Sequence, residues 1–223
     1  MRKLLVKDLM FGYGKHEKKV IDNIYFSISQ GTVIGLVGDN GTGKTTLMKL
    51  ISGILEPNEG KILNEFKSVG ILIEDPALYK DLKVIENLKF YCKLYGRDFQ
   101  IIDEYKDLLG IGMFLKKKAS KLSLGMKQRV GLFIALIASE ELVLLDEPTN
   151  GLDPTGIKDL LILIRKLADE KGITFLISSH ILQNLELICD GYIMMRDSKA
   201  IIYEASKMGQ KKLDEVYFNE VQV

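Results

Sequence analysis

Residues Gly38–Thr45 combine glycines, a lysine and a threonine at a spacing that suits phosphate binding. The segment reads Gly-Asp-Asn-Gly-Thr-Gly-Lys-Thr and fills every fixed position of the pattern GxxxxGK[ST]. Glycines allow a tight turn whose N–H groups face phosphates, Lys44 reaches the outer phosphates, and the Thr45 hydroxyl can ligate Mg²⁺. The alternative is a glycine-rich turn with a solvated lysine. We favour a nucleotide site, because an apolar run precedes the loop and a helical pattern follows it.

Two adjacent acids, Asp146 and Glu147, close the apolar run Leu142–Leu145. In phosphate-loop enzymes an acid at this strand end holds Mg²⁺, and a neighbouring carboxylate can polarise the attacking water. Any buried strand must end at polar residues, so a solvated strand end explains this segment alone equally well. The segments Leu122–Arg129, Pro148–Pro154 and Ser178–His180 around it favour the catalytic interpretation.

The composition excludes several classes of protein. The chain has 223 residues with 31 Lys+Arg and 30 Asp+Glu, and this balance is no footprint for nucleic acid. No apolar run approaches the ~18 residues of a membrane helix, and Met1–Val6 is too short for a secretion signal. Cys92 and Cys189 lie far apart, which gives no support for a disulfide framework or a zinc site. We expect a protein of the reducing cytosol.

The elements that must position these residues alternate between strands and helices. Apolar alternation from Leu4 to Ile28 predicts an antiparallel lobe, and the region from about 84 to 138 is mostly helical. The sequence therefore predicts an α/β fold in one domain over residues 1–223, with a core at about 1–83 and 140–223 and a helical subdomain at about 84–139. Within it we expect buried strands at Val33–Val37, Leu142–Leu145 and Thr174–Ser178, a helix over Ile157–Ala168, and a helical pattern of Leu47, Leu50, Ile51, Ile54 and Leu55.

Taken together, these motifs resemble the nucleotide-binding subunit of an ATP-binding cassette (ABC) transporter over essentially the whole chain. The resemblance implies a P-loop NTPase core with an antiparallel β subdomain and a helical insertion. The corresponding motifs are Walker A (Gly38–Thr45), the signature (Leu122–Met126), Walker B (Leu142–Glu147), the D-loop (Asn150–Asp153), the switch histidine His180 and the adenine-stacking Tyr13. The end of the chain, Leu213–Phe218, resembles the closing helix of such subunits.

The resemblance also implies a role for each motif residue, with ATP and Mg²⁺ as ligands. Lys44, Glu147 and His180 would be catalytic, and Asp153 would communicate across a dimer. Ser123 and Gly125 of the signature would contact ATP held by the partner subunit, although Ser123 is equally suited to cap a helix. Mg²⁺ would be held by Thr45, Glu74 and Asp146. ATP would be bound by Tyr13, Gly38, Asp39, Asn40, Gly41, Thr42, Gly43, Lys44, Thr45 and Thr46.

Two departures from the family pattern narrow the resemblance. The signature reads Leu-Ser-Leu-Gly-Met in place of Leu-Ser-Gly-Gly-Gln, and the glutamine of the Q-loop is Glu74. The signature variant resembles that of subfamilies that export drugs or ions. The segment around Glu74 resembles the corresponding loop of the cassettes that move bacitracin and lantibiotics, which act in peptide-antibiotic immunity and resistance. A neutral substitution in a general exporter cassette is the alternative for Glu74.

The basic cluster Lys116–Lys118 is interpreted as a solvated face without a ligand.

The resemblance implies a separate transmembrane permease subunit and a head-to-tail dimer, formed with itself or with a second ATPase subunit. The chain would work at the cytoplasmic face of a bacterial membrane. A non-transport ABC ATPase in a soluble complex, such as cluster assembly, is the alternative. A cassette that only binds ATP is disfavoured, because Lys44, Asp146, Glu147 and His180 are intact.

Overall fold

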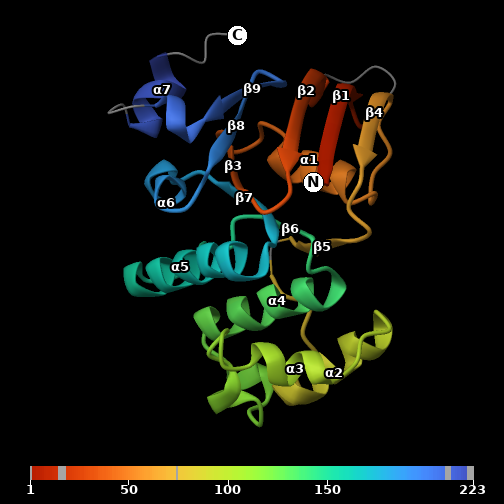
Figure 1. Ribbon diagram of the computed structural model, residues 1–223, viewed down its shortest axis with the longest axis vertical. Helices are drawn as coiled ribbons and strands as arrows, with labels where there is room; N and C mark the ends of the chain where they lie inside the picture. Colours follow the sequence, from red (N-terminus) through yellow and green to blue (C-terminus); the bar gives the residue numbers. More distant parts are fainter. Residues whose placement is uncertain (1, 15–18, 74, 209–211, 220–223) are drawn as a thin grey trace.

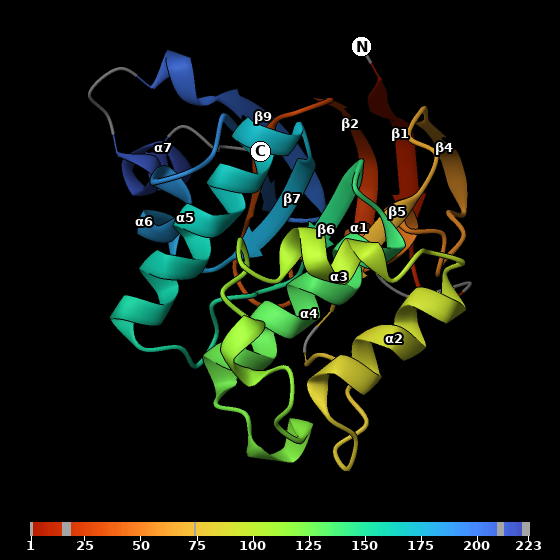
Figure 2. The same ribbon diagram turned by 60° about the horizontal axis from the view of Figure 1, so that its bottom comes forward.

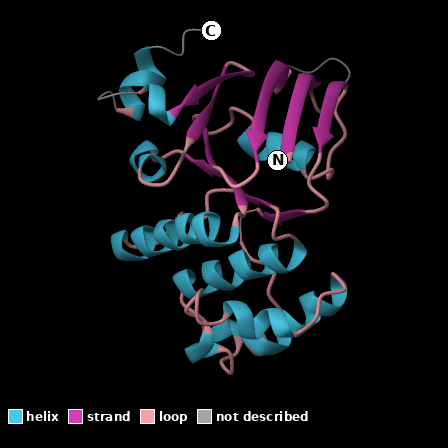
Figure 3. Ribbon diagram, viewed as in Figure 1, coloured by secondary structure: helices cyan, strands magenta, loops and turns pink. Residues whose placement is uncertain are grey.

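Two β-sheets occupy one half of the molecule, and helices alone fill the opposite end of its longest axis (Figure 1). The computed structural model describes residues 2–14, 19–73, 75–208 and 212–219. Figure 2 shows the same arrangement turned toward the helical end, and Figure 3 separates helices from strands by colour. The α/β class predicted from the sequence is confirmed, because strands and helices alternate along the core.

The smaller sheet has three antiparallel strands in the order β2-β1-β4. Strand β1 (Lys3–Phe11) pairs with β2 (Ile21–Ser29), as the apolar alternation predicts, and both bury every second side chain over most of their length. Strand β4 (Glu59–Asn64) pairs with the other edge of β1 and was missed by sequence reasoning. Its side chains are mostly exposed, so it has no apolar alternation to reveal it.

The larger sheet has six strands in the order β5-β6-β7-β3-β8-β9, and only β9 runs antiparallel to its neighbour. Because parallel strands end at the same edge, the loops after β3, β6 and β7 emerge side by side, where ligands of such sheets bind. The strands are β3 (Val33–Val37), β5 (Val69–Leu72), β6 (Leu142–Leu145), β7 (Thr174–Ser179), β8 (Gly191–Arg196) and β9 (Lys199–Glu204).

Helix α1 (Lys44–Ile51) is packed between the two sheets. Alternate residues of β6 show how the larger sheet separates two cores: Leu142 and Leu144 join the cluster that contains α1, whereas Val143 and Leu145 face the opposite cluster. The helical pattern predicted to reach Leu55 ends earlier. Gly53 adopts φ +77°, a left-handed conformation that stops the helix and leaves Ile54 exposed.

The helices of the opposite cluster pack on the other face of the larger sheet. Helix α4 lies against β5 at Gly70, where an added Cβ would come within 2.1 Å of the Ala135 carbonyl oxygen, so only glycine permits this approach. Helix α2 packs on the outer side of α4 (Figure 2). The helices are α2 (Val84–Leu94), α3 (Gln100–Tyr105), α4 (Leu124–Ala138), α5 (Pro154–Lys171), α6 (Leu182–Glu186) and α7 (Leu213–Asn219), with 3₁₀ turns at Gly112–Phe114, Ala119–Lys121 and Ala205–Lys207.

Helix α5 is longer than predicted because it gains a turn at each end. Asp153 accepts a hydrogen bond from the Gly156 N–H at its N-terminus, and Gly172 ends it in a left-handed conformation. Helix α7 confirms the closing helix expected at the end of the chain. Among the described residues, no helix combines the length and apolar composition that crossing a membrane would require.

Candidate functional site

The loop between β3 and α1 folds around its own glycines. Gly41 and Gly43 adopt φ +84° and +100°, conformations that other residues rarely accept. Gly38 is needed for space, because a Cβ there would lie 2.6 Å from the Thr42 hydroxyl oxygen and 2.8 Å from the Met195 carbonyl oxygen. A glycine-rich loop of this kind that leads into the N-terminus of a helix is the usual phosphate-binding arrangement in proteins, because its backbone N–H groups can face the anion.

Lys44 holds its ammonium group inside this loop. Its Nζ donates hydrogen bonds to the carbonyl oxygens of Gly38 at 2.7 Å and Asp39 at 3.1 Å, and lies 3.9 Å from Glu147 Oε1. The side chain is buried. A positive charge fixed at this depth attracts the outer phosphates of a nucleotide. Tyr217 of α7 also lies near the loop, because burial and the nearby Asp39 carboxylate raise the pKa of its phenol.

Asp146 connects the phosphate loop to the neighbouring strand ends. Its two carboxylate oxygens each accept one hydrogen bond at 2.5 Å, from the Thr45 hydroxyl and from the Ser178 hydroxyl. Ser178 also accepts a hydrogen bond from the Glu147 N–H at 2.8 Å. This serine, at the end of β7, fixes both acids, and sequence reasoning missed it because it looks like the end of a strand.

Glu147 is held in an unusual conformation next to His180. Its φ is +48°, which costs a residue with a side chain roughly 1–2 kcal/mol. One carboxylate oxygen, Oε2, lies 2.9 Å from His180 Nδ1. The other, Oε1, is buried and has no hydrogen-bond partner in the described part of the chain. The backbone strain and the buried oxygen without a hydrogen bond indicate that this carboxylate is positioned for a ligand.

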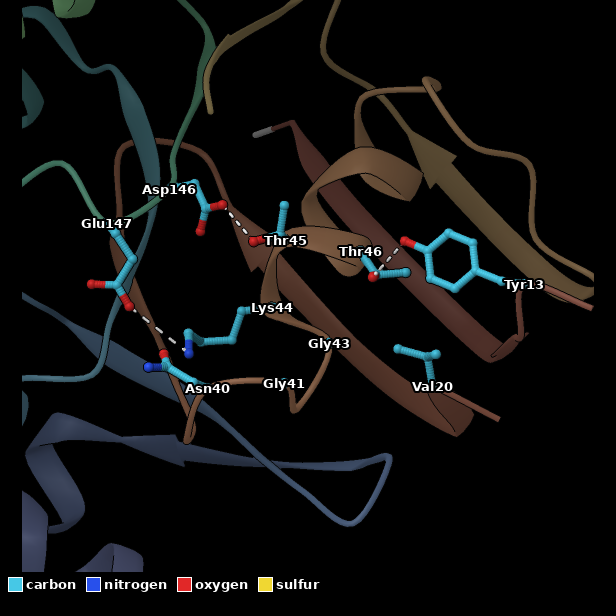
Figure 4. A pocket seen from close by; sticks show the side chains of 10 residues that line it. All are labelled: Tyr13, Val20, Asn40, Gly41, Gly43, Lys44, Thr45, Thr46, Asp146 and Glu147. Atoms are coloured by element: carbon cyan, nitrogen blue, oxygen red, sulfur yellow. Dashed lines mark hydrogen bonds and ion pairs between the residues drawn. The ribbon is translucent and has the colours of Figure 1, made fainter. Parts of the chain in front are cut away.

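A cleft of about 290 Å³ lies over the phosphate loop (Figure 4). Tyr13 stands at one side of it with 60% of its surface exposed, and its hydroxyl lies 3.0 Å from the Thr46 hydroxyl. An exposed aromatic ring at a cleft wall is suited to stacking on a base. The lining residues are Tyr13, Val20, Asn40, Gly41, Gly43, Lys44, Thr45, Thr46, Asp146 and Glu147. Val20 is the residue before β2, and Thr46 lies in the first turn of α1.

Ser123, Gly125 and Asp153 lie elsewhere and do not line this cleft. Ser123 caps α4 by accepting a hydrogen bond from the Met126 N–H at 3.3 Å, so the capping interpretation is correct. Gly125 follows in the first turn of α4, and Asp153 caps α5. Their roles toward a second subunit stay predictions. Glu74 lies outside the described residues.

Comparison with known proteins decides the family. A family profile described as "ABC transporter" matches residues 21–150, which is more than half of the chain and includes the phosphate loop, the signature and the Asp146–Glu147 pair. The chain belongs to the ABC transporter family. This match confirms the resemblance to ABC cassettes that the motifs indicate.

The similarity to known proteins covers most of this chain. The "Lantibiotic transport ATP-binding protein SrtF" of Streptococcus pyogenes is 37% identical over 98% of this chain and 97% of its own. The "Bacitracin transport ATP-binding protein BcrA" of Bacillus licheniformis is 39% identical over 87% of this chain and 67% of its own. Both relatives are named as transport proteins, so the alternative of a soluble cluster-assembly ATPase is not favoured.

Solved structures confirm the fold. The ABC transporter component cbiO1 of Clostridium perfringens superposes with a TM-score of 0.84 at 28% identity, covering 93% of this chain and 90% of its own. The cassette MJ1267 gives the same TM-score at 23% identity, covering 97% of each chain, and supports the fold alone. The family match and the similarity to SrtF show that the chain is an ATP-binding, ATP-hydrolysing subunit of the ABC type.

Replacing Ser178 with alanine is expected to destabilise this cassette and to slow its ATPase. The change leaves an Asp146 oxygen and the Glu147 N–H without their partner, which costs roughly 2–4 kcal/mol and should lower the melting temperature by about 5–10 °C. Calorimetry and a phosphate-release assay measure both effects.

Ser139→Ala provides the matched control for Ser178→Ala. Ser139 is also buried and also makes hydrogen bonds to backbone, donating to the Ser68 carbonyl oxygen and accepting from the Glu141 N–H, but it lies at the opposite end of β6. A comparable loss of stability with normal turnover is expected. If both variants lost turnover equally, Ser178 would have no special connection to the acids.

Proposed function

We propose that this ATPase drives export of peptide antibiotics of the bacitracin or lantibiotic kind through a separate transmembrane subunit. The observation that carries the proposal is the similarity to SrtF and BcrA over 98% and 87% of the chain, together with a cleft that brings Lys44, Asp146 and Glu147 together. The chain would act at the cytoplasmic face of a bacterial membrane, as expected for a subunit that delivers its work to a membrane partner.

The residues around the phosphate loop fit Mg²⁺. Mg²⁺ is held by a few protein oxygens together with phosphates and water, and a dedicated cage of acids is unnecessary. No group of three or more His, Cys, Asp and Glu arranged for a metal occurs among the described residues. The oxygens of Thr45 and Asp146 are in place instead, and Glu74 is proposed from the sequence. When bound, Mg²⁺ would neutralise charge on the outer phosphates.

The proposed reaction is attack of water on the γ-phosphate of ATP. Lys44 would bind the outer phosphates, and Oε1 of Glu147, which has no hydrogen bond in the described part of the chain, would orient the water and accept its proton. His180, hydrogen-bonded to the other oxygen, would hold that carboxylate in place and contact the γ-phosphate. Tyr13 would stack on the adenine, while the loop from Gly38 to Thr46 would surround the phosphates.

A second ATPase subunit would complete each site. Ser123 lies exposed at the N-terminus of α4, away from the cleft of its own chain. Together with the Gly125 N–H it is therefore placed to meet ATP bound by a partner in a head-to-tail dimer, and Asp153 would lie near that contact. Either a second copy or a different cassette could be that partner.

The transmembrane subunit would dock beside α2. A cleft of about 160 Å³ lies there between β5, the segment after it, and helices α2 and α4. Tyr79 and Tyr95 are 50% and 47% exposed close to it, and Phe90 stacks edge-to-face on both Tyr79 and Tyr91. Exposed aromatic side chains gathered in this way are typical of protein interfaces.

Purification of the tagged chain from its native membrane in detergent tests the proposal. We expect a polytopic membrane protein to co-purify, and ATPase activity to change when bacitracin or a lantibiotic is added. A soluble partner without membrane association would contradict the transport role. A membrane partner whose ATPase ignores these peptides would contradict only the proposed substrate class.

Replacing Glu74 with glutamine is expected to leave ATP binding intact while changing turnover or its coupling to transport. The substitution restores the family's neutral amide at a position proposed to face Mg²⁺, and so removes one negative charge. Nucleotide titration and peptide-stimulated phosphate release measure the two effects. If neither turnover nor transport changed, Glu74 would be a neutral variant.

A further inference from the structure

The side chain of Gln128 is buried in α4 with part of its amide unpaired. Gln128 is 4% exposed, and its Oε1 has no hydrogen-bond partner among the described residues. Burying an amide oxygen without a partner is destabilising, and native proteins keep few such groups. Because no described residue satisfies this oxygen, a ligand that binds beside it is one explanation for a glutamine at this position.

Gln128 shares a second cleft with Asp146 and Glu147. This cleft has a volume of about 340 Å³ and is continuous with the phosphate loop at Thr45. Three side-chain atoms of the described residues are buried without a hydrogen-bond partner, and two of them, Gln128 Oε1 and Glu147 Oε1, belong to residues that line it. The lining consists of Thr45, Asp75, Gln128, Asp146, Glu147 and Asn150.

The chemistry of this lining indicates what should fill it. Three of its residues are acids, which accept hydrogen bonds and donate none when ionised, and Gln128 adds an unpaired amide oxygen. A surface rich in acceptors requires donors, and water polarised by a cation is the small donor that fits. The volume has room for several water molecules at about 30 Å³ each.

We propose that Gln128 is a positioning residue whose amide oxygen accepts a hydrogen bond from the water that solvates Mg²⁺ in this cleft. The proposal rests on the nucleotide and Mg²⁺ site described under the proposed function. Gln128 lies in α4, the helix whose N-terminus is capped by Ser123, so a ligand that contacts Gln128 also contacts this helix. Occupation of the cleft would then hold the helix that presents Ser123 and Gly125 to the partner subunit.

Binding of a non-hydrolysable, fluorescent ATP analogue at a series of Mg²⁺ concentrations tests this role. In Gln128→Met, which keeps the length and removes the amide, the Mg²⁺ concentration needed for half-maximal tightening should rise about five- to tenfold, the worth of one hydrogen bond to a polarised group. Affinity measured in EDTA should stay unchanged. Gln128→Glu keeps an acceptor and should retain the Mg²⁺ requirement of the parent or lower it.

Thermal stability separates positioning from a structural role. Because Gln128→Met replaces an unpaired buried acceptor by an apolar group, the melting temperature of the nucleotide-free chain should be unchanged or higher. Gln100→Met, the same change at an exposed position in α3, is the control and should alter none of these values. A lower melting temperature with equal weakening in EDTA and in Mg²⁺ would overturn the proposal, as would an unchanged Mg²⁺ requirement in Gln128→Met. If the parent chain itself showed no Mg²⁺ dependence, the proposed Mg²⁺ site would fail, and the role of Gln128 with it.

Discussion

Replacing Glu147 with glutamine is expected to lower the ATPase rate by about 10²–10⁴-fold, the usual contribution of a general base, while ATP binding is retained. The amide has nearly the same shape, so the φ of +48° and the hydrogen bond from the Glu147 N–H to Ser178 can persist. The lost charge removes the proton acceptor at Oε1 and relieves repulsion of the nucleotide phosphates. Phosphate release and nucleotide titration measure the two effects.

The same substitution is expected to trap the ATP-bound dimer, because hydrolysis would no longer open it. Size-exclusion chromatography with ATP should show a stable dimer of Glu147→Gln and a transient one of the parent. Glu170→Gln serves as the control, since this glutamate is exposed at the end of α5 and pairs only with Lys166 across one turn in the described contacts. Robust steady-state hydrolysis by the purified Glu147→Gln protein would remove Glu147 from its proposed role.

The parts of the fold that the sequence predicts are those with one dominant local signal. Strands β3, β6 and β7 are largely buried on both faces, so each contains a short run of apolar residues in place of an alternating pattern. Strand β4 is mostly exposed and exists because it pairs with β1, a contact distant in sequence that leaves no periodic pattern. The end of α1 depends on the conformation of Gly53, which a helical pattern continuing to Leu55 conceals.

Residues of the candidate site divide in the same way. The loop around Lys44 is predictable, because chemistry fixes its residue types at short spacing. Ser178 of β7 hydrogen-bonds to the acids, and Gln128 of α4 lines a cleft with them, so the contribution of each follows from which elements become neighbours. A buried serine after an apolar strand and a glutamine inside a helix each fit many environments. Their connection to Asp146 and Glu147 therefore required three-dimensional placement.

Replacing Lys44 with methionine is expected to weaken ATP binding by about 100-fold or more, which corresponds to about 2.7 kcal/mol and to the loss of one or two charge-assisted hydrogen bonds. Lys44 is the only cationic residue among those lining the described cleft, where Asp146 and Glu147 carry the opposite charge. Methionine has a similar length but leaves two carboxylates facing the phosphates without compensation. Titration with ATP and with its fluorescent analogue measures the loss.

Lys49→Met separates this effect from a general loss of positive charge. Lys49 lies in the last turn of the same helix, outside the cleft lining, so nucleotide affinity should be unchanged. Adding Glu147→Gln to Lys44→Met should recover part of the lost affinity, because it removes one of the two uncompensated charges. If the double variant did not recover binding, the charge of Lys44 would not be its main contribution. Lys44 would then act mainly by its hydrogen bonds to the carbonyl oxygens of Gly38 and Asp39, which hold the shape of the loop.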